Sequence, residues 1–504
     1  MRTGISAILA LSTLALGAIS VRAQDPRVIA KPEAVTQLQE AVIAVSGADH
    51  AADATDELRE LALALPALEG VDRRQARAML ARPPSDEQSG SDSYYGTVWS
   101  VGATAGREFY DSPGGQFRIH YVTGGDDAAD PGYVELVAER ADHSEQVEND
   151  ELGWPAPKSD GDKGDLGEVA TGRTDIYLAD LAGGLFGYAA TDDGSGECTS
   201  APYKCFAYLV LDNDYAETGY GYGGDPDIPL SATVAHEYNH VLQFNLDTNQ
   251  DSWMFESTAT WAEEKAFPAA DDWIVTFMDD WAAGSLIPVT KSDPNRFYGS
   301  AVWNHWLDAR YGADTVLRAW QLSRAVSPKD YAVGAYDRAI KEAGSDRGFP
   351  REFGRFAAAT SEWQSGSGGF PDAADLPDVS RRGTLTRGQD RTGLALDNTS
   401  DRLFHVDPRA ADEITLRVTA PRGLQAGLAL VGRRGPAAAP NRVVRKFREI
   451  PGQGRGSVKL KNAQTFDRIT AVVVNADGRV DGSKPLFGDF SYRRDNQRLT
   501  ARIR

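Results

Sequence analysis

The spacing of apolar residues predicts helices in the first part of the chain. In "AVTQLQEAVIAV" and "ATDELRELALALPALEG" apolar residues recur every three or four positions, as on one face of an α-helix. The stretch "ARPPSDEQSGSDS" that follows has the composition of a linker. We therefore expect residues 24–100 to form a helical N-terminal region and a linker. Such a region is typical of a propeptide, and equally of helices that pack permanently against the protein.

Beyond the linker, the pattern changes to strands and then back to helices. "QFRIHYV" alternates apolar and polar residues as a half-buried strand does, and "TDIYLADL" and "FAYLVLDN" are further strand candidates. From Pro229 to about residue 363 the apolar residues return to helical spacing, as in "SAVWNHWLDARYG". Strands followed by helices predict an α+β domain, which we place at residues 101–370.

The last part of the chain changes pattern once more. "QSGSGGFPDAADLPD" has the composition of a linker, and the chain then alternates short β-like runs with turn residues. This pattern predicts a small β-sandwich over residues 371–504, in which the apolar run "ITAVVV" is an inner strand. Such a domain could bind a surface or a polymer.

The first residues indicate export. Arg2, the apolar run "ISAILALSTLALGAIS" and the small residues "VRA" before Gln24 form a secretory signal peptide over residues 1–23. No later run is long enough to cross a bilayer, so we expect a secreted, extracellular protein with no membrane partner after signal cleavage. Cys198 and Cys205 are the only cysteines, and an even pair in an exported chain favours a disulfide bond.

Net charge narrows the range of partners. The formal charge is −20 and the isoelectric point is near 4.9, which argues against a nucleic acid or an anionic membrane as partner. This net negative charge is compatible with an acidic secreted enzyme that acts on a protein or peptide.

The sequence "HEYNH" at residues 236–240 carries the candidate chemistry. On a helix, His236 and His240 lie one turn apart on one face, so both imidazoles can bind one zinc ion. Glu237 is rotated away from that face, near enough to contact a water molecule at the metal without being a ligand. The implied chemistry is metal-assisted hydrolysis with Glu237 as the general base.

A catalytic zinc ion needs a third protein ligand. Leu246 stands where a metzincin would place a third histidine, which excludes that arrangement. The segment "DSWMFESTATWAEEKAFP" predicts a second helix that a short loop folds back onto the first, with Asp251 or Ser252 as its cap. Glu256 on this helix is our candidate ligand. Glu263 shares its face and would orient a ligand histidine, or replace Glu256 as the third ligand.

The segments "HEYNH" and "WMFESTATW" together resemble the zinc site of gluzincins such as thermolysin and aminopeptidase N. The similarity is greater still to a group of secreted bacterial metalloprotease-like proteins, and it covers roughly residues 105–365. It implies a thermolysin- or aminopeptidase-like zincin domain and one catalytic zinc ion (Zn²⁺). Two departures are a spacing to Glu256 shorter than in gluzincins and Ser257 where gluzincins carry glycine.

The resemblance also implies a substrate class and one more catalytic residue. "NRFYGSAVWNHW" is similar to the segment that supplies a tyrosine hydroxyl to the oxyanion, and Tyr298 is the matching position. The G-x-M-E-N run of the aminopeptidases is missing, which favours an endopeptidase. In the endopeptidase reading, "CFAYLVLDN" forms the sheet edge along which an extended peptide binds, braced by Cys198 and Cys205.

Two readings stay open beside the peptidase. One is a catalytically inactive zincin-fold binding or surface protein, and the other is a hydrolase of a non-peptide bond. The segment "DNDYAETGYGYGGDPD", residues 212–227, is rich in Asp and Gly and could hold calcium, although it lacks an EF-hand pattern.

Overall fold

The computed structural model describes residues 29–46, 53–83, 107–164, 172–181, 184–216, 225–284, 286–324, 331–452, 454–479, 491–492 and 494–504. The predicted signal peptide, residues 1–23, and most of the predicted linker before residue 101 lie outside these ranges. Within these ranges, no helix combines the length and the apolar composition that crossing a membrane would require.

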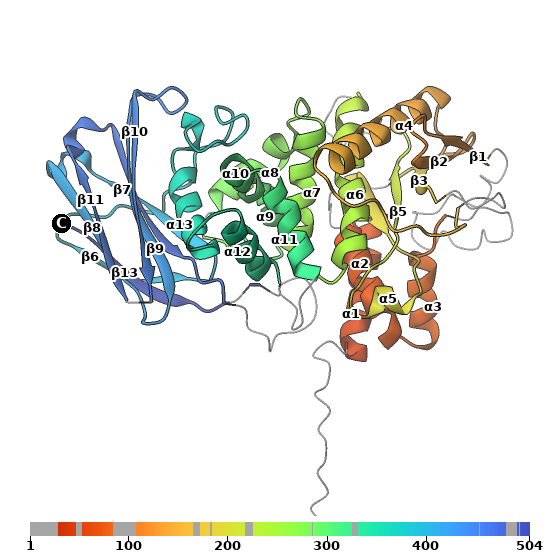
Figure 1. Ribbon diagram of the computed structural model, residues 1–504, viewed down its shortest axis with the longest axis horizontal. Coiled ribbons are helices and arrows are strands. Elements are labelled where there is room, and N and C mark those ends of the chain that lie inside the picture. The colour runs from red at the N-terminus through yellow and green to blue at the C-terminus, as the bar shows by residue number, and fades with distance from the viewer. Residues whose placement is uncertain are drawn as a thin grey trace, which may run out of the picture.

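Helices and strands divide the molecule into three parts, as Figure 1 shows. Helices of the N-terminal region lie beside a mixed sheet at one end, a group of helices forms the middle, and the C-terminal strands form the other end. This mixed composition of helices and sheets is consistent with the α+β prediction at the level of fold class.

In its described part the N-terminal region contains three helices, of which α1 and α2 lie where the apolar periodicity predicts helices and α3 was not predicted from that periodicity. Their buried side chains form a cluster with Tyr177, Tyr188 and Val210 of the mixed sheet. The helices therefore cover one face of that sheet and are part of the folded molecule. Their bounds are α1 (Lys31–Val45), α2 (Thr55–Ala64) and α3 (Gly70–Met79).

The mixed sheet has five strands in the order β1-β2-β3-β5-β4. β2, β3 and β5 run parallel, whereas β1 and β4 are antiparallel to their neighbours and form the two edges. The helices α4 and α6 pack on the face opposite α1–α3, so β2 is fully buried rather than half-buried as predicted. The strands are β1 (Arg107–Asp111), β2 (Phe117–Val122), β3 (Thr174–Ala179), β4 (Gly187–Ala190) and β5 (Tyr208–Asp212).

The prediction that residues 205–213 form the sheet edge is wrong. β5 pairs with β3 on one side, where Ile176 faces Leu209, and with β4 on the other, where Ala189 faces Leu209. A continuous apolar run such as "YLVL" is typical of an interior strand with both faces covered. The edge is β4, whose sequence "GYAA" is too short and too small to stand out as a strand.

Two of the remaining helices, α4 and α5, lie between strands of the mixed sheet, and those from α6 onward follow the sheet in the chain and build the middle of the molecule. α6 and α7 lie against each other, α9 and α10 pack on α7, and α8 packs on α9. The helices are α4 (Pro131–Glu145), α5 (Gly196–Thr199), α6 (Asp227–Asp247), α7 (Ser252–Ala266), α8 (Asp272–Ala283), α9 (Pro294–Gly299), α10 (Ala301–Tyr311), α11 (Asp314–Arg324), α12 (Ala332–Glu342) and α13 (Phe349–Thr360).

The C-terminal strands form two four-stranded antiparallel sheets that share an apolar core. The orders are β10-β9-β12-β7 and β11-β8-β13-β6, the arrangement of a β-sandwich. The run "ITAVVV" lies in β12 between β9 and β7, so its prediction as an inner strand is confirmed. The strands are β6 (Asp390–Leu396), β7 (Ser400–Val406), β8 (Glu413–Thr419), β9 (Gln425–Arg434), β10 (Arg442–Pro451), β11 (Arg455–Lys461), β12 (Arg468–Asn475) and β13 (Gln497–Ile503).

The stretch between the helices and the C-terminal sheets is packed, although its composition predicts a linker. Phe370 and Leu376 are buried in the main core, and the Trp363 indole donates a hydrogen bond to the Pro377 carbonyl at 2.6 Å. Core residues of β9 and β12 join the same cluster as Phe356 of α13. The sheets are therefore continuous with the helical part that carries α9.

Asp401 of β7 provides a test of the junction between the C-terminal sheets and the helical part, because it lies near Arg296 of α9. Burial raises the pKa of Asp401 from 3.8 to about 7, against the attraction of Arg296 on α9. The folded state therefore holds this proton more tightly than the unfolded chain, and the stabilisation is lost as pH rises from about 4 to about 7. We expect Asp401→Asn to raise the free energy of unfolding by about 2 kcal/mol near pH 8.

Near pH 5 the variant should differ little from the wild type, because Asp401 is already neutral there. Thermal unfolding of both proteins at the two pH values measures the difference. A variant that is equally destabilised at both pH values would show that the carboxylate is needed at this junction.

Candidate functional site

α6 brings the two histidines of "HEYNH" together. His236 and His240 lie one helical turn apart, with ring centroids 4.7 Å apart, and both side chains are buried. The Nε2 atoms of both rings approach the same carboxylate oxygen, Glu256 Oε2, at 3.2 Å and 3.4 Å. The pair is therefore arranged as metal ligands on one helix face are.

Glu256 reaches the histidines because α7 folds back on α6, as the short connecting loop predicts. Asp251 precedes α7, but its carboxylate does not bind the amides of that helix. It accepts hydrogen bonds from the amides of Ala332 at 3.0 Å and Ser491 at 2.6 Å. These two distant segments therefore fix the start of α7 and, with it, the position of Glu256.

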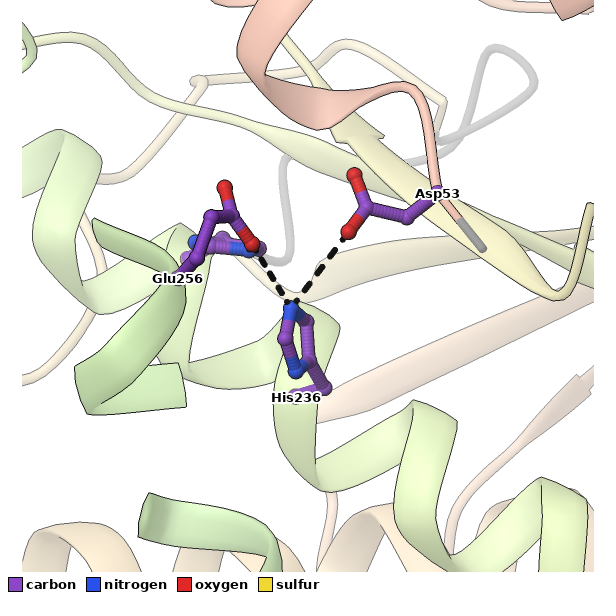
Figure 2. Close-up of side chains that lie close together, drawn as sticks. Asp53, His236 and Glu256 are labelled. Atoms are coloured by element: carbon purple, nitrogen blue, oxygen red, sulfur yellow. Dashed lines mark hydrogen bonds and ion pairs between the residues drawn. The ribbon is translucent and has the colours of Figure 1, made fainter. Parts of the chain in front are cut away.

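Asp53 is a fourth member of the group, and no sequence motif indicated it. Its Oδ2 lies 3.5 Å from His236 Nε2, and one ligand atom from each of Asp53, His236, His240 and Glu256 lies within 4.8 Å of the others. Figure 2 shows Asp53 and Glu256 pointing toward the same ring nitrogen from two different elements. The four buried side chains could hold a metal ion.

Hydrogen bonds on the far side of each ring fix the two histidines. His236 Nδ1 lies 2.5 Å from Glu263 Oε1, and His240 Nδ1 lies 2.8 Å from Gln243 Oε1. Both partners are acceptors here, so each Nδ1 donates, and the other ring nitrogen, Nε2, is the one that faces Glu256. Glu263 therefore has the orienting position predicted for it, and Gln243 is an orienting residue that the motif did not reveal.

The chemistry of this group fits a cation. His240 Nε2 and Glu256 Oε1 are buried without a hydrogen-bond partner, although other polar atoms surround them. Two buried carboxylates facing two imidazole nitrogens are stable only when a positive charge, from a proton or a metal ion, lies between them. Two nitrogen and two oxygen donors are a ligand set that zinc accepts.

The same carboxylates act on the protonation of His236. Burial lowers the pKa of His236, but hydrogen bonds with Asp53, Glu256 and Glu263 outweigh it and raise this pKa well above its ordinary value. A proton and a metal ion therefore compete for the same Nε2 atom, and metal affinity should fall as the solution becomes more acidic.

Glu237 lies beside the metal-ligand group, rotated off the histidine face. Its Oε2 accepts a hydrogen bond from the Thr55 hydroxyl at 2.9 Å. Burial, with repulsion from Asp53, raises the pKa of Glu237 to about 8. A carboxyl group with a pKa near neutral can both accept and return a proton, which is what a general base in hydrolysis must do. Glu237 also lines a pocket together with Phe186, Thr233 and His236.

Tyr298 faces the same pocket from α9. Its hydroxyl donates a hydrogen bond to Asp53 Oδ2 at 2.5 Å, and its ring centroid lies 5.8 Å from that of His236. Burial and the charge of Asp53 raise the pKa of Tyr298 well above 10, so it stays a neutral donor. The structure therefore brings together all five residues that the sequence proposed for the site: His236, Glu237, His240, Glu256 and Tyr298.

The disulfide bond between Cys198 and Cys205 is present, as predicted. The Cys205 amide donates to the Phe244 carbonyl at 2.9 Å, and the Thr248 amide donates to the Tyr203 carbonyl at 2.8 Å. The bond therefore braces the C-terminal end of α6 and not the rim of the sheet edge, because β4 and not β5 forms that edge.

The candidate calcium segment, residues 212–227, is described only at its two ends, because residues 217–224 lie outside the described ranges. At the first end, Asp212 Oδ1 accepts from the amides of Asp214 and Tyr215, as in an ordinary turn. A second acidic group, Glu264, Asp271 and Asp372, lies on the other side of α7, and two of its members are not buried.

Comparisons of the sequence with models of known protein families and with curated proteins give no match.

Glu263 allows a direct check of the orienting bond. We expect Glu263→Gln to weaken metal binding about 10- to 100-fold, because the amide holds the His236 ring less firmly than the carboxylate does. Competition with a chromogenic chelator measures the affinity. Glu264→Gln is a matched control on the next position of α7, and its metal affinity should equal that of the wild type.

Proposed function

We propose that the chain is a secreted, zinc-dependent endopeptidase of the gluzincin type. The observation that carries the proposal is the convergence of His236 Nε2, His240 Nε2 and Glu256 Oε2, with Glu237 beside them. Two histidines one turn apart, a carboxylate from the next helix and an adjacent glutamate are the parts that metal-assisted peptide hydrolysis requires.

The sheet supports a thermolysin- or aminopeptidase-like arrangement. β4 is the antiparallel edge strand that packs on α6, the helix that carries His236 and Glu237, whereas β1 forms the other edge of the sheet. An edge strand beside the metal site offers backbone hydrogen bonds to an extended peptide, which favours a peptide substrate over a small molecule.

The protein residues have separate roles in this mechanism. His236, His240 and Glu256 would hold zinc, which when bound supplies the Lewis-acid chemistry that activates water and polarises a peptide carbonyl. Glu237 accepts the proton of the attacking water and delivers it to the leaving amine. The Tyr298 hydroxyl donates a hydrogen bond to the oxygen that becomes negatively charged. Glu263 and Gln243 keep the two imidazoles in place.

Hydrolysis of a denatured protein tests this function. The purified mature chain, loaded with zinc, should cleave internal peptide bonds of denatured casein, and a chelator should stop the cleavage until zinc is restored. Mass spectrometry of the products distinguishes internal cleavage from removal of single terminal residues. A zinc-loaded chain that cleaves no peptide but hydrolyses an ester would indicate a non-peptide bond as the substrate.

A further inference from the structure

The loop before α2 carries a carboxylate into the metal-ligand group. Asp53 is buried, and its two oxygens have different partners. Oδ1 accepts the Thr55 amide at 2.7 Å, a local bond of the kind that starts a helix. Oδ2 accepts the Tyr298 hydroxyl at 2.5 Å and lies 3.5 Å from His236 Nε2. The start of α2 explains the position of Oδ1, but it does not explain why Oδ2 points at the ligands.

Thr55 contacts the group proposed as general base. Its hydroxyl donates to Glu237 Oε2 at 2.9 Å and accepts the Ala189 amide at 2.9 Å. Asp53 also forms a parallel β-bridge with Gly187 of the edge strand β4. The residues from 53 to 55 therefore lie along the sheet edge, in the place where an extended peptide would pair.

Arg59 anchors the same segment on the other side of the site. Its side chain is 1% exposed, and it donates to the carbonyls of Thr248 at 2.9 Å and Gln250 at 3.1 Å. The guanidinium also lies 4.3 Å above the Phe255 ring, one residue before Glu256. A buried arginine with these partners holds α2 against the connection between α6 and α7.

We propose that Asp53 is a fourth protein ligand of the metal and that residues 53–55 occupy the substrate position, so that this conformation of the chain is latent. The inference rests on the proposed function. A catalytic zinc site keeps one position free for water and substrate, whereas four protein ligands close it. Asp53 lies against His236 and accepts a hydrogen bond from Tyr298, and Thr55 donates a hydrogen bond to Glu237. Each group needed for hydrolysis therefore already has a partner from residues 53–55.

Latency has a quantitative consequence. A substrate or inhibitor must displace the Asp53 carboxylate. Its apparent affinity therefore equals its intrinsic affinity multiplied by the fraction of molecules in which residues 53–55 have left the site. Asp53→Asn and Asp53→Ala remove the charged ligand and should enlarge that fraction. Glu69→Gln is the matched control, because Glu69 precedes α3 in the same N-terminal region, is exposed and forms an ion pair with Lys31 at the surface.

The first measurement uses the full chain loaded with cobalt(II) in place of zinc. The visible absorption of cobalt reports the ligand set, and acetohydroxamate is the probe that binds a free coordination position. We expect the spectra of Asp53→Asn and Asp53→Ala to differ from the wild-type spectrum, and both variants to bind acetohydroxamate about tenfold more tightly or better. Glu69→Gln should behave as the wild type does. Identical spectra and affinities in all four proteins would overturn the assignment of Asp53 as a ligand.

The second measurement is the rate of cleavage of a short chromogenic peptide by the same zinc-loaded proteins. Both Asp53 variants should be faster than the wild type and Glu69→Gln, about tenfold or more. A wild type as fast as the variants would overturn the proposed latency. If no protein cleaves peptide but the cobalt results distinguish the Asp53 variants, the peptidase proposal fails while the fourth ligand stands.

Discussion

Glu237→Gln is expected to reduce peptide hydrolysis about 10³-fold while the protein keeps its bound metal. The amide has nearly the same shape as the carboxylate and can still accept a hydrogen bond from Thr55, but it cannot take a proton from water. Glu237 is off the histidine face and 1% exposed, so the change removes a proton acceptor without removing a ligand. The loss corresponds to about 4 kcal/mol of transition-state stabilisation.

The comparison of Glu237→Gln with the wild type also needs a protein whose activity is not limited by residues 53–55. The substitution is therefore measured in the wild type and together with Asp53→Asn, on denatured casein and on a short peptide. Glu135→Gln on the exposed face of α4 is the matched control and should retain full activity. Full cleavage by the Glu237→Gln protein with metal bound would remove Glu237 from the mechanism.

The second large effect concerns the third ligand. Glu256→Gln should lower metal affinity about 10³-fold or more, beyond the 10- to 100-fold expected when only an orienting residue is changed. The reason is position: Glu256 Oε2 lies within 3.4 Å of both Nε2 atoms, whereas Glu263 contacts only the Nδ1 side of His236. The amide oxygen of glutamine is a weaker, uncharged donor to a metal ion.

Calorimetric or chelator titrations of Glu256→Gln and Glu263→Gln, side by side, give the two losses. Circular dichroism spectra of both variants check that α6 and α7 remain folded. The variant that loses more metal affinity identifies the ligand, whatever the absolute size of the two losses. A larger loss for Glu263→Gln than for Glu256→Gln would make Glu263 the ligand and Glu256 its neighbour.

Much of the site could be predicted because it is local in the sequence. His236, Glu237 and His240 share one helical turn, and the rotation of an α-helix fixes which of them face the same side. Glu256 follows after a loop too short to do anything but turn back, and Glu263 lies two turns further on the same helix face. In these cases the spacing along the chain sets the spacing in space.

Asp53, β4 and the packed stretch after Trp363 could not be predicted, each for a physical reason. Thr55 and Glu237 are 182 positions apart, and no periodicity connects residues brought together only by tertiary packing. β4 has four residues, "GYAA", and its place at the edge depends on pairing with β5. The stretch around Phe370 has a linker composition, but its few apolar side chains are enough to bury it in the core.

Metal content is the most direct test of the central claim that His236, His240 and Glu256 bind one catalytic metal ion. The wild type is purified without chelator, supplied with a slight excess of zinc, desalted and analysed by plasma mass spectrometry beside a His236→Ala, His240→Ala double variant. We expect about one zinc ion per wild-type chain and almost none in the double variant. A wild type that retains no metal, or a double variant that retains as much as the wild type, would contradict the account.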